Sequence, residues 1–112
     1  MLTLTAPVAG NSVKADLTEI AASNGYTAGG TATTITTSTA SGTAKATGTD
    51  VTFTASGGSI ANFRYAVLYN DTPTSPADPL IGFWDYGATL TITSGNSFLV
   101  DLDASAGVFT IV

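Results

Sequence analysis

The sequence contains neither cysteine nor histidine. The absence of cysteine rules out disulfides, thiolate zinc sites and thiol nucleophiles. The absence of histidine removes the imidazole general base, the Ser-His and Cys-His catalytic pairs and the histidine metal ligand. Most hydrolase designs need residues that this chain does not have, so we expect a protein without enzymatic activity, cofactor or metal.

Charge is scarce as well, above all positive charge. Charged residues form 10% of the sequence, the net charge is −5, and the basic residues are Lys14, Lys45 and Arg64 alone. Phosphate backbones and anionic lipids are bound through clusters of Lys and Arg, so we expect neither nucleic acid nor a membrane as partner. No apolar run approaches a membrane span, and residues 1–10 lack the basic and apolar regions of a signal peptide. We therefore expect synthesis in the cytoplasm without export by a standard signal.

What the chain does have is apolar content. Hydrophobic residues make up 44% of its 112 residues, which is enough for one folded domain. With so few charges, the polar surface must come from Thr, Ser and Asn, or part of the surface must be covered by other protein. We expect an extended N-terminal arm over residues 1–10, followed by a single domain over residues 11–112.

Alternating apolar and polar residues dominate the pattern along the chain. Leu2, Leu4 and Ala6 alternate with threonines before Pro7, which predicts an arm that pairs with a sheet edge of its own chain or of a neighbour. One helical candidate, of one to three turns, covers residues 11–25. Strands are predicted within residues 31–54 and at 59–70, 80–87, 88–97, 97–104 and 107–112. Short strands with regular turns indicate an all-β fold, an antiparallel β-sandwich that we expect to be a jelly roll.

A glycine-rich stretch, NGYTAGG, places Gly25, Gly29 and Gly30 close together. Glycine amides can bind phosphate, but this spacing matches neither a P-loop nor a dinucleotide-binding fingerprint, and no lysine follows. We therefore predict a structural turn in which one or more of these glycines adopt positive φ and Tyr26 serves as a packing anchor.

The segment from residue 31 to residue 54 is rich in Thr, Ala, Ser and Gly. Regular ranks of threonine can bind an ordered surface such as ice, yet the threonines here lack a fixed repeat. We interpret the segment as strands whose faces are wetted by hydroxyl groups or lie against a protein partner.

Carboxylates and aromatic residues are the remaining candidates for a site. Asp101 and Asp103 share one face of a predicted strand, and we interpret them as solvating residues in preference to a glycosidase pair. On a strand, Trp84 and Tyr86 share one face and Phe83 takes the other. One of these groups is expected in the core, and the other is expected to anchor a partner or stack on a sugar.

Several segments together carry a resemblance to a known group of proteins. DLTEIAASN leads into GYTAGG, followed by FRYAVLYNDTP, by DPLIGFWDYG and by a terminal GVFTI. In this order and spacing they resemble small virion proteins of tailed bacteriophages, over roughly residues 16 to 112. The resemblance implies an accessory structural protein of the particle, a capsid decoration or cement protein with a jelly-roll fold and no catalytic residues. The N-terminal arm and the Thr- and Ala-rich middle depart from that group.

From this resemblance and the composition we expect a protein that decorates and stabilises a phage capsid on its outer surface. It would bind the major capsid protein as a homo-oligomer, a dimer or a trimer. The alternative is a receptor- or glycan-binding module of a head or tail fibre, with Trp84 and Tyr86 as its sugar platform. The contact regions are predicted to be the arm, the proline-rich segment 70–79 and the aromatic segment 83–86, through Leu2, Leu4, Pro7, Pro73, Pro76, Pro79, Phe83, Trp84 and Tyr86.

Overall fold

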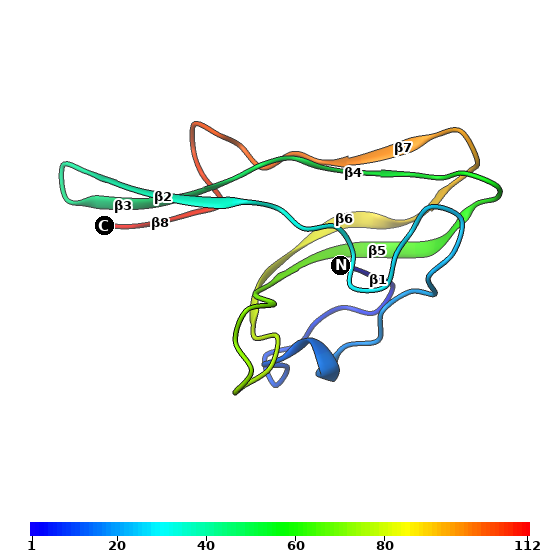
Figure 1. Cartoon of the computed structure of the whole chain (residues 1–112), viewed down its shortest axis with the longest axis horizontal. Coiled ribbons are helices and arrows are strands. Elements are labelled where there is room, and N and C mark those ends of the chain that lie inside the picture. The colour runs from blue at the N-terminus through cyan, green and yellow to red at the C-terminus, as the bar shows by residue number, and fades with distance from the viewer.

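The alternating pattern produces eight antiparallel strands in the computed structural model, which describes residues 1–112 (Figure 1). The predicted all-β class is confirmed, and the predicted helix is a single 3-10 turn, η1 (Lys14–Asp16). No helix is long and apolar enough to cross a membrane. The strands are β1 (Leu2–Thr3), β2 (Ile35–Ala40), β3 (Thr43–Gly48), β4 (Val51–Thr54), β5 (Ile60–Tyr69), β6 (Leu80–Ile92), β7 (Ser97–Val100) and β8 (Phe109–Ile111).

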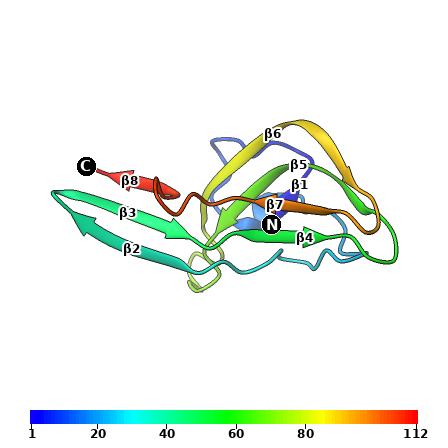
Figure 2. The same cartoon turned by 90° about the horizontal axis from the view of Figure 1, so that it is seen from above.

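The strands form two layers that separate at one end. The lower layer is the sheet β1–β5–β6, and the pair β4–β7 lies over it (Figure 1). The third sheet, β2–β3–β8, continues the upper layer because β3 runs on into β4 and β7 is followed by β8 (Figure 2). This grouping into sheets of three, three and two strands differs from the two packed sheets of a jelly roll, so that finer prediction is not confirmed.

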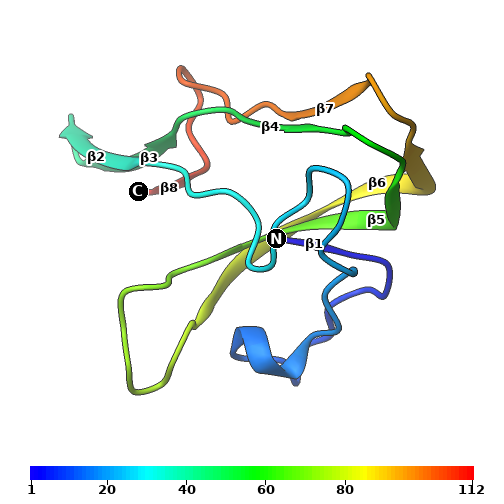
Figure 3. The same cartoon turned by 45° about the vertical axis from the view of Figure 1, so that its right-hand side comes forward.

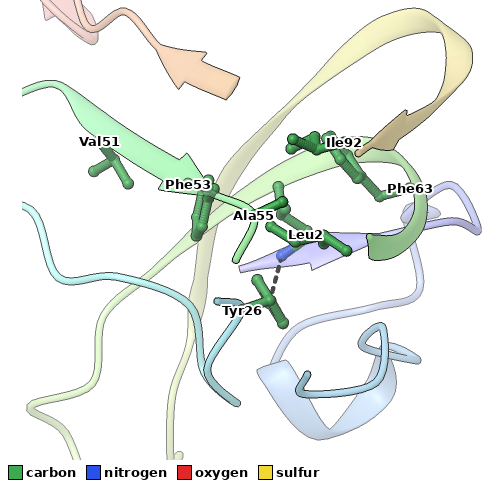
Figure 4. Packing of buried hydrophobic residues seen from close by; sticks show 8 residues of the cluster. Leu2, Tyr26, Val51, Phe53, Ala55, Phe63 and Ile92 are labelled. Atoms are coloured by element: carbon green, nitrogen blue, oxygen red, sulfur yellow. Dashed lines mark hydrogen bonds between the residues drawn. The ribbon is translucent and has the colours of Figure 1, made fainter. Parts of the chain in front are cut away.

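The core lies where β4 and β7 cover β5 and β6. Its members come from both layers, from β1 and from the glycine-rich turn, and Figure 4 shows them converging between the layers. Val51, Phe53 and Ala55 are buried on one face, as their alternation predicts. The cluster consists of Leu2, Tyr26, Val51, Phe53, Ala55, Ile60, Phe63 and Ile92.

Strand β6 differs from its prediction, because residues 80–87 and 88–97 were expected to form separate strands. Gly87 does have a positive φ, of 90°. Pairing with β5 nevertheless continues on both sides of it, since Tyr65 pairs with Asp85 and Phe63 pairs with Leu90. The intervening residues of β6 bulge outward, and a bulge absorbs the glycine conformation without ending the strand.

The molecule is extended for its size. It measures 48 × 29 × 25 Å, and its radius of gyration is 14.8 Å, where a compact chain of this length has about 13 Å. Its accessible surface is 6461 Å², whereas a monomer of this mass exposes roughly 5,700 Å². The sheet β2–β3–β8 projects beyond the lower layer and so contributes to this extended shape (Figure 2).

Candidate interaction surface

The predicted pair Asp101 and Asp103 lies beyond the end of β7 (Ser97–Val100) and not on a strand. No group of three or more Asp and Glu side chains in the chain is placed to hold a metal ion. Asp103 accepts hydrogen bonds from the backbone N–H groups of Ser105 and Ala106, at 2.7 and 2.8 Å. These bonds lower the pKa of Asp103 and tie its carboxylate to its own turn. Asp101 is exposed just after the end of β7 and lines a shallow hollow that Asp85 also lines.

The glycine-rich stretch NGYTAGG forms a structural turn, as predicted. Gly25, Gly29 and Gly30 have φ values of 99°, 89° and 81°. Gly29 is held from both sides, because its N–H donates to the Glu19 carboxylate at 2.6 Å and its carbonyl accepts from the Tyr69 hydroxyl at 2.8 Å. Its backbone amide is therefore committed to the chain's own carboxylate and is not open to an anionic ligand.

Tyr26 connects this turn to the first strand. Its hydroxyl accepts a hydrogen bond from the Leu2 N–H at 2.9 Å, drawn in Figure 4, and donates to Glu19 at 2.7 Å. Burial raises the pKa of Tyr26 above its ordinary range, and the Glu19 carboxylate adds to that effect. The ring packs on Phe53 with centroids 5.6 Å apart. The predicted packing role of Tyr26 is confirmed.

The N-terminal arm is only partly available to a partner. Leu2 and Thr3 are fully buried, and β1 pairs with β5 of its own chain. The prediction that Leu2 contacts a partner is therefore wrong, because sequence alternation does not show whose sheet an arm completes. Leu4 is 48% exposed, and Pro7 is half-buried.

The N-terminal amine is buried with this arm. The Met1 ammonium donates to the Val67 carbonyl at 3.0 Å, and the Val67 N–H donates to the Met1 carbonyl at 2.8 Å. Burial lowers the pKa of the amine to about 6, against a smaller opposing effect of the Glu19 carboxylate. The first residues are thus part of the lower layer and not a free extension.

The proline-rich segment 70–79 forms the loop between β5 and β6, as its prolines predict. Leu80 N–H donates to the Ser12 carbonyl and Lys14 N–H donates to the Asp78 carbonyl, each at 2.9 Å. The base of the loop is therefore fastened to the region of η1. Pro76 is exposed at the far part of the loop, whereas Pro73 and Pro79 are half-buried.

The predicted aromatic contacts of β6 are all exposed. Phe83, Trp84 and Tyr86 are 47%, 40% and 58% exposed. Phe83 packs edge-on against Tyr65 of β5, and Tyr86 packs edge-on against Phe98 of β7, so they leave the strand on different faces as predicted.

An ion pair stands beside these rings. Arg64 donates two hydrogen bonds to the Asp85 carboxylate, at 2.7 and 2.9 Å. The guanidinium, followed by the Gly87 N–H, lowers the pKa of Asp85 to about 2. The pair borders a shallow hollow of about 210 Å³ that Trp84, Tyr86 and Asp101 also line.

A larger groove opens where the two layers diverge, as Figure 3 shows for the ribbons. It encloses about 610 Å³ and is lined mainly by apolar residues. One wall is the lower layer and the other is β2–β3–β8 with the adjoining part of β4. Representative lining residues are Leu68, Ile81 and Trp84 below and Ile35, Ala46 and Phe109 above.

Sequence reasoning predicted strands within residues 31–54 and at 107–112, but it missed the sheet that they form together and the groove that this sheet flanks. The signal was present in TAKATG and VFTIV, where Ala44 and Ala46 alternate with polar residues and Phe109 and Ile111 flank Thr110. Such alternation marks a strand with one apolar face. It could not show that the chain leaves this face uncovered.

Comparisons with protein-family models, with curated proteins and with solved structures found no match for the chain.

Proposed function

We propose that this protein is a structural component of a bacteriophage virion that decorates and stabilises the capsid by binding the major capsid protein on its outer surface. The observation that carries the proposal is the set of large hydrophobic side chains that the fold leaves exposed on β6 and on the arm, namely Phe83, Trp84, Tyr86 and Leu4. Aromatic side chains are enriched at the centres of protein interfaces. The virion assignment itself is supported by the resemblance of the segments from DLTEIAASN to GVFTI.

Such a role needs complementary surface and no reactive group. A protein that joins capsid subunits gains affinity from buried apolar anchors and from backbone that is already ordered before binding. The aromatic residues of β6 provide the anchors. The proline loop provides ordered backbone, since both ends of it are hydrogen-bonded to the chain. We therefore place the capsid contact on the loop 70–79, on Phe83, Trp84 and Tyr86, and on Leu4 and Pro7 of the arm.

The test is binding to capsids of the phage that encodes the chain. The double variant Phe83→Ala, Tyr86→Ala removes two exposed rings and should lower capsid occupancy in a co-sedimentation assay. Thr89→Ala, an exposed change on the same strand, should leave occupancy as it is. Wild-type protein that does not bind the capsid at all would refute the proposal. Deletion of residues 1–7 is unsuitable, because it removes core residues together with the arm.

A glycan- or receptor-binding module of a fibre is the second candidate. It is favoured by one local feature, the hollow in which Trp84 and Tyr86 adjoin the Arg64–Asp85 pair and Asp101. Exposed aromatic faces beside charged hydrogen-bonding groups are suited to stacking on a sugar and binding its hydroxyls. A glycan-array signal that Trp84→Ala abolishes would support this candidate. Finding hundreds of copies on each particle would favour decoration.

A further inference from the structure

We propose that the sheet β2–β3–β8 is the surface through which two copies of this chain associate, with the apolar faces of their sheets packed against each other. We call this projecting sheet the tongue. The inference rests on the proposed function in one respect, because it assigns a surface to the homo-oligomer that we expect to bind the capsid. It is carried by the register of the tongue, by its exposure and by its charge.

The register divides the tongue into two chemically different faces. Thr37 pairs with Ala46, and Ala46 pairs with Phe109, so these three side chains lie on one face. Successive residues of a strand point to opposite faces, which assigns the remaining positions. The apolar face carries Ile35, Thr37, Thr39, Ala44, Ala46, Phe109 and Ile111. The opposite face carries Thr36, Ser38, Ala40, Thr43, Lys45, Thr47 and Thr110.

The chain covers only the base of the apolar face. Ala46 is buried and lines the groove, but Ile35, Phe109 and Ile111 are 39%, 48% and 65% exposed. Figures 1 and 2 show the tongue extending past β5 and β6, with no other part of the chain beneath its outer end. An amphipathic sheet of this kind is stable when a second layer covers its apolar face.

The charge distribution favours a second copy as that layer. The net charge of −5 would oppose association between copies if it were spread evenly. The strands of the tongue contain no acidic residue, and their one charged residue, Lys45, lies on the polar face, where its ammonium donates to the Ser105 carbonyl at 2.8 Å. Two apolar faces can therefore meet without bringing like charges together.

The shape of the apolar face also permits it to pack on itself. Its large side chains, Phe109 and Ile111, stand along β8 at one edge of the tongue, while the small side chains of Ala44 and Ala46 occupy β3. A two-fold axis along β3 would place the β8 edge of one copy over the β2 edge of the other. Phe109 and Ile111 of one copy then face Ile35, Thr37 and Thr39 on β2 of the other, and the alanines of the two β3 strands face each other, at the usual spacing of about 10 Å between packed sheets.

The experiment is sedimentation equilibrium of the full chain with three single variants. Phe109→Glu and Ile111→Glu place a charge on the apolar face and should raise the dimer dissociation constant by about 30-fold or more, as loss of an interface anchor does. Thr110→Glu adds the same charge to the same strand on the polar face and should change the constant little. A wild-type chain that stays monomeric, or equal effects of all three variants, would overturn the proposal.

A second measurement tests the proposal without the glutamate variants, in case these do not fold. Because the chain lacks cysteine, a single spin label can be attached at Thr39→Cys on the apolar face or at Ser38→Cys on the polar face. Dipolar coupling between copies should be clearly stronger at position 39 than at position 38. Equal or reversed coupling would overturn the proposal.

Capsid binding separates this inference from the proposed function. A wild-type protein that dimerises through the tongue but does not bind the capsid would refute capsid decoration and would still support the dimer surface. A protein that binds the capsid but shows no self-association through the tongue would refute the dimer surface alone.

Discussion

Replacing Gly25 with alanine is expected to destabilise the protein far more than the same change at another glycine of similar φ. Gly25 has a φ of 99°, and a Cβ at this position would clash with the Thr54 carbonyl oxygen at the end of β4. Gly95 has a φ of 87° and offers open space to a Cβ. Both variants place a non-glycine residue in the left-handed region, which costs about 1–2 kcal/mol. Only Gly25→Ala must also displace backbone.

The clash between the new Cβ and the Thr54 carbonyl oxygen determines how much more stability Gly25→Ala loses than Gly95→Ala. Separating the Cβ from the Thr54 oxygen requires the turn to move away from β4, where the Ser56 N–H donates to the Asn24 carbonyl at 2.9 Å. Forcing extra atoms into a packed site costs typically about 1–3 kcal/mol. Gly25→Ala should therefore lose about 1–3 kcal/mol more of the free energy of unfolding than Gly95→Ala, a large part of a domain's total of about 5–15 kcal/mol.

Urea denaturation followed by circular dichroism measures this difference. With an m-value of about 1–3 kcal/mol/M, the midpoint of Gly25→Ala should fall on the order of 1 M below that of Gly95→Ala. The two m-values should agree, which shows that the same surface is exposed on unfolding. Equal midpoints for the two variants would refute the reasoning that the turn is fixed by its close approach to β4.

Further predictions concern the hydrogen bonds of the same region and the buried amine. Tyr26→Phe leaves the buried Leu2 N–H without its acceptor and should lower the free energy of unfolding by about 1–3 kcal/mol in urea titrations; an unchanged midpoint would contradict the network. For the chain with a free amine on Met1, the folded pKa of about 6 lies below the ordinary value of 8.0 for this amine. The unfolded state then binds more protons between these values, so stability should rise with pH from about 6 to about 8, by up to about 3 kcal/mol. A flat urea midpoint across this window would mean that the amine is solvated.

Local patterns predicted the elements of this fold well. Val51, Phe53 and Ala55 alternate with polar residues and are buried as a strand face, and the glycines of NGYTAGG adopt the positive φ expected of a turn. These features depend on sequence neighbours only, since the period of a strand and the freedom of glycine act over a few residues.

Long-range pairing could not be predicted in the same way. The alternation at Leu2 shows that it belongs to a strand, yet only the pairing of β1 with β5 shows that this strand completes its own sheet. Gly87 by itself predicts the end of a strand. Only the pairing with β5 shows that β6 continues beyond it. The groove depends on two layers that diverge, so no single segment contains the information that defines it.

The turn between β2 and β3 has a practical consequence. Gly42 has a φ of 78° with nothing near the position of a Cβ, and Ser41 beside it is exposed. This turn forms the outer end of the tongue, farthest from the core (Figure 2). Loop tips of this kind accept inserted sequence, because neither burial nor long-range hydrogen bonding constrains them. A peptide epitope inserted between Ser41 and Gly42 should therefore be presented in solvent while the rest of the chain folds, which makes the hairpin a natural attachment point for displayed cargo.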